Sequence, residues 1–428
     1  ALETACYRNR FVGAQHGEVD GRAATRYIRR AGPGGGGADS GPEMPRHSSR
    51  IELSQSALQH NIRFIRRRVG SGTQISLVVK ANAYGHGTRE IVSMAERVGV
   101  RHFAVASSFE AEEVLDARGE GSGVMVMGIL YDEDLPWVIE QGVEFFVFDL
   151  PRLEAALEVA KDVGREATIH LEVETGGNRT GLPAEDVPRA VSFLKKHRAH
   201  LRFEGFCTHY AGIETLANQF RIVKQDKRFA ELYRVAKKAR FLPAKRHKAC
   251  SAAALGFPDT SMEMVRVGTA AYGLWPSPDV YNLFLMEGHS TKESPLHRVL
   301  SWKTNLMHLK RVPRDEFVGY GTAFQAPRDM TIGVFPVGYS NGYPRAMSNR
   351  GHVLVRGKKA PIVGVVSMNM FMADVTKIAD VTVGDEAVLI GRQGSNTITL
   401  RSFSEFANAL NNEFASRLPA AIPRVIVR

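Results

Sequence analysis

The regular alternation of short apolar runs with amphipathic segments between residues 51 and 285 constrains the fold more than any other feature of the chain. Such alternation predicts a parallel sheet, because parallel strands need a long, usually helical, connection between them. About eight such units fit a (β/α)8 TIM barrel, and a doubly wound sheet is the alternative. The expected strands are 75–79, 102–106, 124–128, 144–148, 168–173, 203–209 and 265–269. The expected helices include 54–68, 109–118, 152–163 and 219–240.

After about residue 286 strand-like runs dominate, and glycines and prolines punctuate them. The runs predict strands at 299–307, 331–337, 352–355, 361–366, 371–375 and 386–390, with one helix at 402–414. We therefore expect an α/β chain with a barrel over 48–285 and a separate, mainly β domain over 286–428.

Residues 1–47 differ from the rest in their low hydrophobicity and in the glycine run 34–37. Such composition predicts a disordered tail outside the native fold. We expect the native start near Met44, the first methionine; a mitochondrial-type presequence is the alternative, against which Glu18, Asp20 and the glycine run argue.

Composition excludes several classes of protein. The chain has 428 residues, of which 44% are hydrophobic and 24% charged, as in globular proteins. No apolar run approaches the roughly 20 residues that span a bilayer. The net charge of +11 comes from scattered basic residues, so we expect no nucleic-acid partner. The three cysteines show no metal-ligand spacing, so no metal site is expected.

The string VVKANAYGHG, residues 78–87, places a single lysine, Lys80, where a buried strand should end. Lysine is seldom fully buried without a partner. At such a place its amine can form a Schiff base with a carbonyl compound, pyridoxal phosphate among them. A lysine that merely extends its head group into water is the alternative.

Polar residues follow several other predicted strands. They are the loop 175–181, the tripeptide 208–210, the tripeptide 251–253 and the segment 266–268. In a barrel these would meet at the C-terminal face, where barrel enzymes place their active sites. Ordinary turn chemistry explains each piece equally well. In the second domain, Tyr320 and Tyr339 lie in glycine-rich segments that either expose an acid/base group or form hairpin turns.

Together, and in this order, these motifs resemble the alanine racemase family of fold-type III pyridoxal phosphate enzymes. The resemblance covers roughly residues 48–428. It implies a barrel, a β domain, pyridoxal 5'-phosphate as cofactor, alanine as substrate, and a homodimer whose active sites use both chains. It also implies that D-alanine is supplied for peptidoglycan of the cell wall in a bacterial cytoplasm.

The resemblance implies a role for each matching residue. Lys80 would hold the cofactor and act as the base for the D-enantiomer, and Tyr320 from the partner subunit would act as the base for the L-enantiomer. A racemase needs such a pair, because one base tends to return the proton to the face it came from. Tyrosine has an ordinary pKa near ~10, so it needs help to act as a base, and His209 is the candidate helper.

The remaining implied contacts concern the cofactor and the substrate. Arg266 would face the pyridine nitrogen and donate a hydrogen bond without transferring a proton. Ser251 and the backbone near Gly268 would bind the phosphate. The other implied contacts come from Tyr84 beside the cofactor, Arg179 at the ring hydroxyl and substrate carboxylate, and Tyr339 with Met368 on the substrate side.

Some positions depart from the usual family pattern. Glu172 stands where many members have a carbamylated lysine, and we expect its carboxylate to hold Arg179 without modification. Ser367 and Asn369 stand where cysteine and aspartate are common. These changes leave a broader serine/alanine racemase as an alternative. A barrel-type decarboxylase and a non-catalytic cofactor carrier are further alternatives, against which Arg266 and Tyr320 argue respectively.

Overall fold

The computed structural model describes residues 47–288, 294–407 and 411–428. The predicted tail 1–47 therefore lies outside the described residues, except for His47. The predicted boundary between barrel and β domain at 285/286 stays a prediction.

Eight parallel strands form one sheet in the order β8-β7-β6-β5-β4-β3-β2-β9. They are β2 (Gln74–Val78), β3 (His102–Val105), β4 (Gly123–Val126), β5 (Glu144–Val147), β6 (Ala167–Glu172), β7 (Leu201–Cys207), β8 (Lys245–His247) and β9 (Met264–Val267). The ring closes between β8 and β9 through a parallel bridge of Cys250 to Arg266, whose backbone N–H donates to Ala249 O at 3.0 Å. This closure confirms the predicted barrel.

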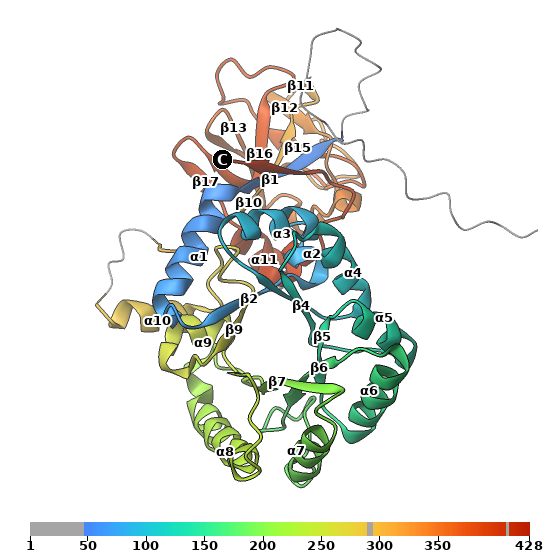
Figure 1. Ribbon diagram of the computed structural model, residues 1–428. Coiled ribbons are helices and arrows are strands. Elements are labelled where there is room, and N and C mark those ends of the chain that lie inside the picture. Colours follow the sequence, from blue (N-terminus) through green and yellow to red (C-terminus); the bar gives the residue numbers. More distant parts are fainter. Residues whose placement is uncertain (1–46, 289–293, 408–410) are drawn as a thin grey trace, which may run out of the picture. The chain divides into compact units, whose positions relative to one another are not determined.

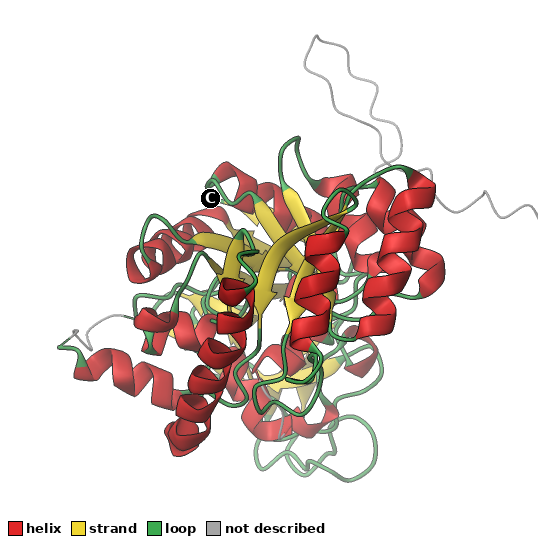
Figure 2. Cartoon of the chain, turned by 60° about the horizontal axis from the view of Figure 1, so that its bottom comes forward, coloured by secondary structure: helices red, strands yellow, loops and turns green. Residues whose placement is uncertain are grey.

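Helices surround the barrel strands on the outside (Figure 1 and Figure 2). They are α1 (Gln55–Val69), α3 (Thr88–Arg97), α4 (Ser108–Ala117), α5 (Leu135–Glu140), α6 (Leu150–Val163), α7 (Val187–Lys196), α8 (Gln219–Lys238), α9 (Ser251–Gly256) and α10 (Pro278–Met286). Side-chain oxygens cap the starts of four of these helices, α1, α4, α6 and α10. The Ser54 and Asp149 side chains accept the N–H groups of Ala57 and Arg152 at the starts of α1 and α6.

The mainly β part contains two further sheets. The larger has the order β14-β13-β16-β10-β1-β18, with β17 beside β16, and the smaller has the order β11-β12-β15. Their strands are β1 (Ser49–Ser54), β10 (Leu300–Asn305), β11 (His308–Val312), β12 (Met330–Phe335), β13 (His352–Val355), β14 (Lys358–Pro361), β15 (Phe371–Asp374), β16 (Glu386–Gln393), β17 (Asn396–Ile398) and β18 (Arg424–Val427). Two helices, α11 (Leu400–Ala407) and α12 (Asn411–Ser416), lie where one was predicted.

Strand β1 precedes the barrel in the chain but belongs to the larger sheet of the β part. It pairs antiparallel with β10 and parallel with β18. The Trp302 indole N–H donates to Ser49 Oγ at 3.1 Å across the β1–β10 pair. The β part is thus built from both ends of the described chain.

Candidate active site

The residues singled out in the barrel lie at the carboxyl ends of its strands. Lys80 comes two residues after the end of β2, and His209 comes two residues after β7. Ser251 begins α9 just after β8, and Arg266 with Gly268 lies at the end of β9. Because the strands are parallel, these ends share one face of the ring. The structure therefore gathers residues from four parts of the sequence at the mouth of the barrel.

Lys80 opens α2 (Lys80–Tyr84), a turn of unusual hand. Four consecutive residues, Ala81 to Tyr84, have φ between 51° and 54°, the left-handed region. For L-residues this conformation costs roughly 1–2 kcal/mol each. Hydrogen bonds hold it: Glu110 accepts from Ala81 N at 2.7 Å, and Asn82 Oδ1 accepts from Thr88 N at 2.9 Å. A strained turn that is held so firmly beside a lysine points to a functional constraint on where Lys80 stands.

Arg266 is the most constrained side chain at the mouth, with only 4% of its surface exposed. One terminal nitrogen donates to His247 Nδ1 and to His247 O, and the other donates to Thr208 O at 2.7 Å and to His209 Nδ1 at 3.4 Å. Its Nε–H has no acceptor among the described residues. The guanidinium is therefore fixed by four acceptors and has one N–H left for a ligand.

His209 is held neutral beside this guanidinium. Burial, together with the positive charges of Arg266, Arg179 and Lys80, lowers the pKa of His209 to about 3. Since Nδ1 accepts from Arg266, the ring proton must sit on Nε2. His209 thus presents an N–H donor rather than a titrating base at neutral pH.

Ser251, Gly268 and Tyr84 form a small cradle beside Arg266 at the end of β9. The Ser251 hydroxyl accepts from the N–H of Gly268 at 3.0 Å and from the N–H of Ala270 at 3.3 Å. A Cβ at Gly268 would come within 2.6 Å of the Tyr84 hydroxyl. Burial raises the pKa of Tyr84 to about 12, so its hydroxyl keeps its proton and can donate. Backbone N–H groups, a hydroxyl and a phenol converge here.

The pairing expected between Glu172 and Arg179 is not formed. Glu172 is buried and Arg179 is exposed, and no ion pair or hydrogen bond joins them in the part of the chain that the structure describes. Glu172 Oε2 has no hydrogen-bond partner within residues 47–288, 294–407 and 411–428. Burial raises the pKa of Glu172, while a hydrogen bond from Thr180 and the charges of Arg266 and Arg179 act against that rise. The carboxylate acts on both arginines through its charge rather than by contact.

The site residues expected from the β part do not join this cluster within one chain. Tyr320 is 74% exposed, and Tyr339 and Met368 are also exposed. Tyr339 N donates to Ser367 O, which holds the two loops together. No hydrogen bond or ring contact links these three side chains to Lys80 or Arg266 among the described residues.

Sequence reasoning missed a set of buried polar side chains behind Arg266. They are Ser76, His102, His170 and His247, from strands β2, β3, β6 and β8, and they contact the partly buried Glu144 of β5, whose side chain is 15% exposed. The signal that was available is a histidine or glutamate within or at the start of a predicted buried strand, where an apolar residue is usual.

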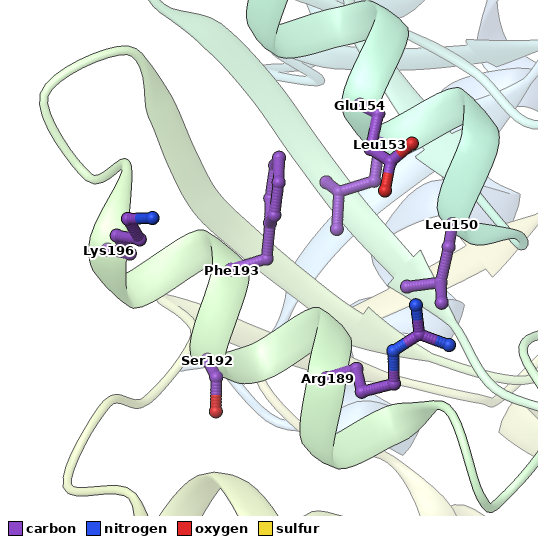
Figure 3. Close-up of a pocket in the computed structure, with 7 residues that line it drawn as sticks. All are labelled: Leu150, Leu153, Glu154, Arg189, Ser192, Phe193 and Lys196. Carbon is purple, nitrogen blue, oxygen red and sulfur yellow. The ribbon is translucent and has the colours of Figure 1, made fainter.

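Among the described residues, a cavity lies away from the barrel mouth, and neither a metal cluster nor a membrane-spanning helix is present. A cavity of about 330 Å³ lies outside the ring between α6 and α7, lined among others by Leu153, Arg189 and Phe193 (Figure 3). No cluster that could hold a metal ion occurs in residues 47–288, 294–407 and 411–428. Across the same residues, no helix combines the length and apolarity that crossing a membrane requires.

Fold and site together define a barrel enzyme with an appended β domain and a lysine at the end of the first barrel strand. Family models identify it further: "Alanine racemase, N-terminal domain" matches residues 53–276, and "Alanine racemase, C-terminal domain" matches residues 299–426. The chain belongs to the alanine racemase family. This confirms the expected family and the expectation of an isomerase.

Individual relatives agree with this assignment. An alanine racemase of Halothermothrix orenii is 36% identical over 87% of this chain and 95% of its own, and one of Methanococcus maripaludis is 32% identical over 89% and 99%. Among solved structures, the alanine racemase from E. faecalis has a TM-score of 0.80 at 30% identity, covering 89% of this chain and 98% of that one. The enzyme from Bacillus anthracis with bound L-Ala-P has a TM-score of 0.80 at 28% identity, covering 90% and 96%.

Proposed function

We propose that the protein is a pyridoxal phosphate-dependent alanine racemase that interconverts L- and D-alanine, supplying D-alanine for peptidoglycan in the cytoplasm. The observation that carries the proposal is that Lys80, just after β2, and Arg266, near the end of the neighbouring strand β9, lie at the same face of the barrel. The chain's membership of the alanine racemase family supports the same reaction.

The residues at the barrel mouth fit this cofactor. The free Nε–H of Arg266 suits an uncharged acceptor such as the pyridine nitrogen. The Ser251 hydroxyl and the N–H groups near Gly268 suit a phosphate, and the Tyr84 hydroxyl lies at the same cradle. Lys80 supplies the amine for covalent attachment. Arg179, exposed at the rim after β6, is left for the ring hydroxyl and the substrate carboxylate.

When bound, the cofactor would delocalise the electron pair left after the α-proton is removed. The protein's own groups decide where that proton goes. Lys80 would remove or return it on the face used by D-alanine. Arg266 keeps its proton and donates only a hydrogen bond, which restrains how far charge spreads into the ring and so disfavours side reactions.

Tyr320 would serve the opposite face, in the active site of the partner subunit. Its exposure in this chain, with that of Tyr339 and Met368, supports a second chain covering it. His209 would help Tyr320, since its Nε2–H can donate to a phenolate oxygen. We therefore propose a homodimer with shared active sites, in which Tyr339 and Met368 line the substrate side.

Covalent attachment tests the proposal. The protein is incubated with pyridoxal phosphate, reduced with borohydride and digested, and the modified peptide is identified by mass spectrometry. We expect the added mass on Lys80. Lys248 is the matched control, because it is buried near the end of β8 but paired with Asp226 at 2.6 Å. Modification of Lys248 with Lys80 unmodified would contradict the proposal.

A further inference from the structure

Arg266 is connected to a carboxylate on the far side of the barrel interior through two histidines. His247 Nδ1 accepts from Arg266, and His247 Nε2 lies 2.8 Å from His170 Nδ1. His170 Nε2 in turn lies 2.7 Å from Glu144 Oε2. We call the chain Glu144–His170–His247–Arg266 the interior relay.

The hydrogen bonds of the interior relay fix where its protons are. Arginine only donates, so His247 Nδ1 must accept and its proton sits on Nε2. His247 Nε2–H then donates to His170 Nδ1, which leaves the proton of His170 on Nε2, facing Glu144. An ionised carboxylate only accepts, so it matches that end of the relay. Every bond has one donor and one acceptor only when both histidines are neutral and Glu144 is ionised.

The charges around the relay favour the same protonation pattern. Burial lowers the pKa of both His170 and His247; the Arg266 charge adds to this at His247, and Glu144 opposes it at His170. Burial tends to raise the pKa of Glu144, but hydrogen bonds from His102 and His170 outweigh it, and the pKa lies below its ordinary value. His102 Nε2 donates to the same Oε2 at 3.2 Å, and its Nδ1 lies 2.9 Å from Ser76 Oγ.

The backbone makes room for the relay. A Cβ at Gly205, on the neighbouring strand β7, would come within 1.9 Å of His170 Nδ1. The pairing of β6 with β7 shifts register between Ile169 and His170. The Phe146 ring lies over the relay, with its centroid 5.8 Å from that of His247 and 5.7 Å from Arg266 Cζ. A barrel interior is normally filled with branched apolar side chains, so this space is committed to polar groups.

No carboxylate touches Arg266 itself among the described residues, so its buried charge is balanced at a distance. A buried cation without compensation is costly. Glu172 acts on Arg266 through its charge without touching it. Glu144 is joined to the guanidinium by the hydrogen bonds of the two neutral histidines.

We propose that Glu144 is a positioning residue for the racemase reaction: through His170 and His247 it fixes the orientation of Arg266 and thereby the Nε–H offered to the cofactor ring. This rests on the proposed function for its last link, the contact of Arg266 with the cofactor. The protonation pattern of the relay does not depend on that link.

The first measurement is the tautomeric state of His170 and His247 by NMR of the full chain with isotope-labelled histidine, with and without pyridoxal phosphate. We expect both rings to be neutral at pH 7, with the proton on Nε2. A proton on Nδ1 of His247, or a doubly protonated ring at neutral pH, would overturn the proposal even if the cofactor binds.

The second measurement uses Glu144→Gln, with Glu204→Gln as the matched control. Glu204 is a buried carboxylate on β7 that pairs with Lys245 and acts on His170 only through its charge, so it controls for the hydrogen bond that Glu144 makes. Loss of the negative charge at 144 destabilises nearby cations, so the pH midpoint of the visible band of the bound cofactor should fall by about 0.5 unit or more. The control should retain the parent midpoint.

An unchanged midpoint and unchanged histidine tautomers in Glu144→Gln would overturn the proposal. Failure of the unaltered protein to bind pyridoxal phosphate would instead contradict the proposed function, and the histidine tautomers would still decide the relay.

Discussion

Gly268 lies against the Tyr84 hydroxyl so closely that a Cβ at this glycine would be 2.6 Å from the phenol oxygen. The two residues come from opposite ends of the barrel sequence, and adjacent strands β2 and β9 bring them together. Tyr84 is also held from behind, because its ring packs against Tyr272 with centroids 5.3 Å apart. There is little room for Tyr84 to retreat.

Gly268→Ala should therefore displace Tyr84 and weaken cofactor binding by roughly tenfold, about 1.4 kcal/mol. A fluorescence titration with pyridoxal phosphate measures this. Gly72→Ala is the control, since a Cβ there meets nothing within 4 Å. Equal affinity in Gly268→Ala and the unaltered protein would show that the cradle is not the phosphate site.

The shared active site predicts complementation between two inactive variants. Lys80→Ala removes one base and Tyr320→Phe the other, so each variant alone should lose most of its activity. In a mixed dimer one site would carry both defects and the other neither. After subunits are exchanged, the mixture should recover about a quarter of the unaltered activity, because half of the dimers are mixed and each has one intact site.

The measurement is alanine racemisation before and after mild unfolding and refolding of the mixed variants. The two variants refolded separately are the controls. No recovery, with dimers present by light scattering, would mean that Lys80 and Tyr320 of different chains do not share a site.

His86 predicts a loss of stability in mild acid. It is fully buried and its Nδ1–H donates to the carbonyls of Ala83 and Tyr84, both at 3.0 Å. Burial lowers the pKa of His86 to about 4. The unfolded chain takes up the proton near pH 6.5 and the folded chain does not, so stability is present above pH 6.5 and falls as the pH drops towards 4.

When the pH is lowered from 7.5 to 5, His86 alone should lower the free energy of unfolding by about 2 kcal/mol. In urea unfolding, the free energy of unfolding of His86→Asn should fall by about 2 kcal/mol less than that of the parent between pH 7.5 and pH 5. Asparagine keeps a hydrogen-bond donor and does not titrate. His308→Asn, at an exposed histidine, should behave as the parent does. Identical pH dependence in all three proteins would contradict the assignment.

Glu172 predicts an effect through charge alone. Its carboxyl is buried and forms no ion pair with the residues that the structure describes, yet it lies near enough to Arg266 and Arg179 for their charges to act on its pKa. Glu172→Gln keeps the shape and should lower kcat/KM for alanine by roughly tenfold, because the positive potential at the mouth rises. Unchanged kinetics would show that the position usual for a carbamylated lysine carries no needed charge here.

The barrel and the position of Lys80 could be predicted because the signals for them lie within short continuous segments of the sequence. Strand β2 and Lys80 lie in one string, and helices α4 and α6 begin at the capping side chains of Ser107 and Asp149. Strand β8 was missed because only Lys245–His247 pair, too few residues to show a period.

The strands of the β part were harder to predict from the sequence. The predicted strand 361–366 is wrong, because β14 covers Lys358–Pro361 and ends where the predicted strand was expected to begin. Gly364, with φ of 75°, breaks the extended backbone where the strand was expected to continue. Strand β1 was not predicted at all, since its partners β10 and β18 lie far away in sequence.

The interior relay could not be predicted because its members come from four different strands. A histidine in an apolar run has no sequence mark that says which other strand it faces. Only the closed barrel brings His170 Nδ1 and His247 Nε2 to a distance of 2.8 Å. The absence of contact between Glu172 and Arg179 has a similar cause, since the loop after β6 turns through Asn178 with φ of 52° and leaves Arg179 exposed.

The most direct test of the central claim is α-proton exchange of L-alanine in heavy water, with the purified protein and pyridoxal phosphate, and with the products separated on a chiral column. Two bases on opposite faces predict deuterated D-alanine as the product. Exchange of the α-proton with complete retention of configuration would contradict the two-base site formed by Lys80 and Tyr320, and the absence of any exchange would contradict alanine as the substrate.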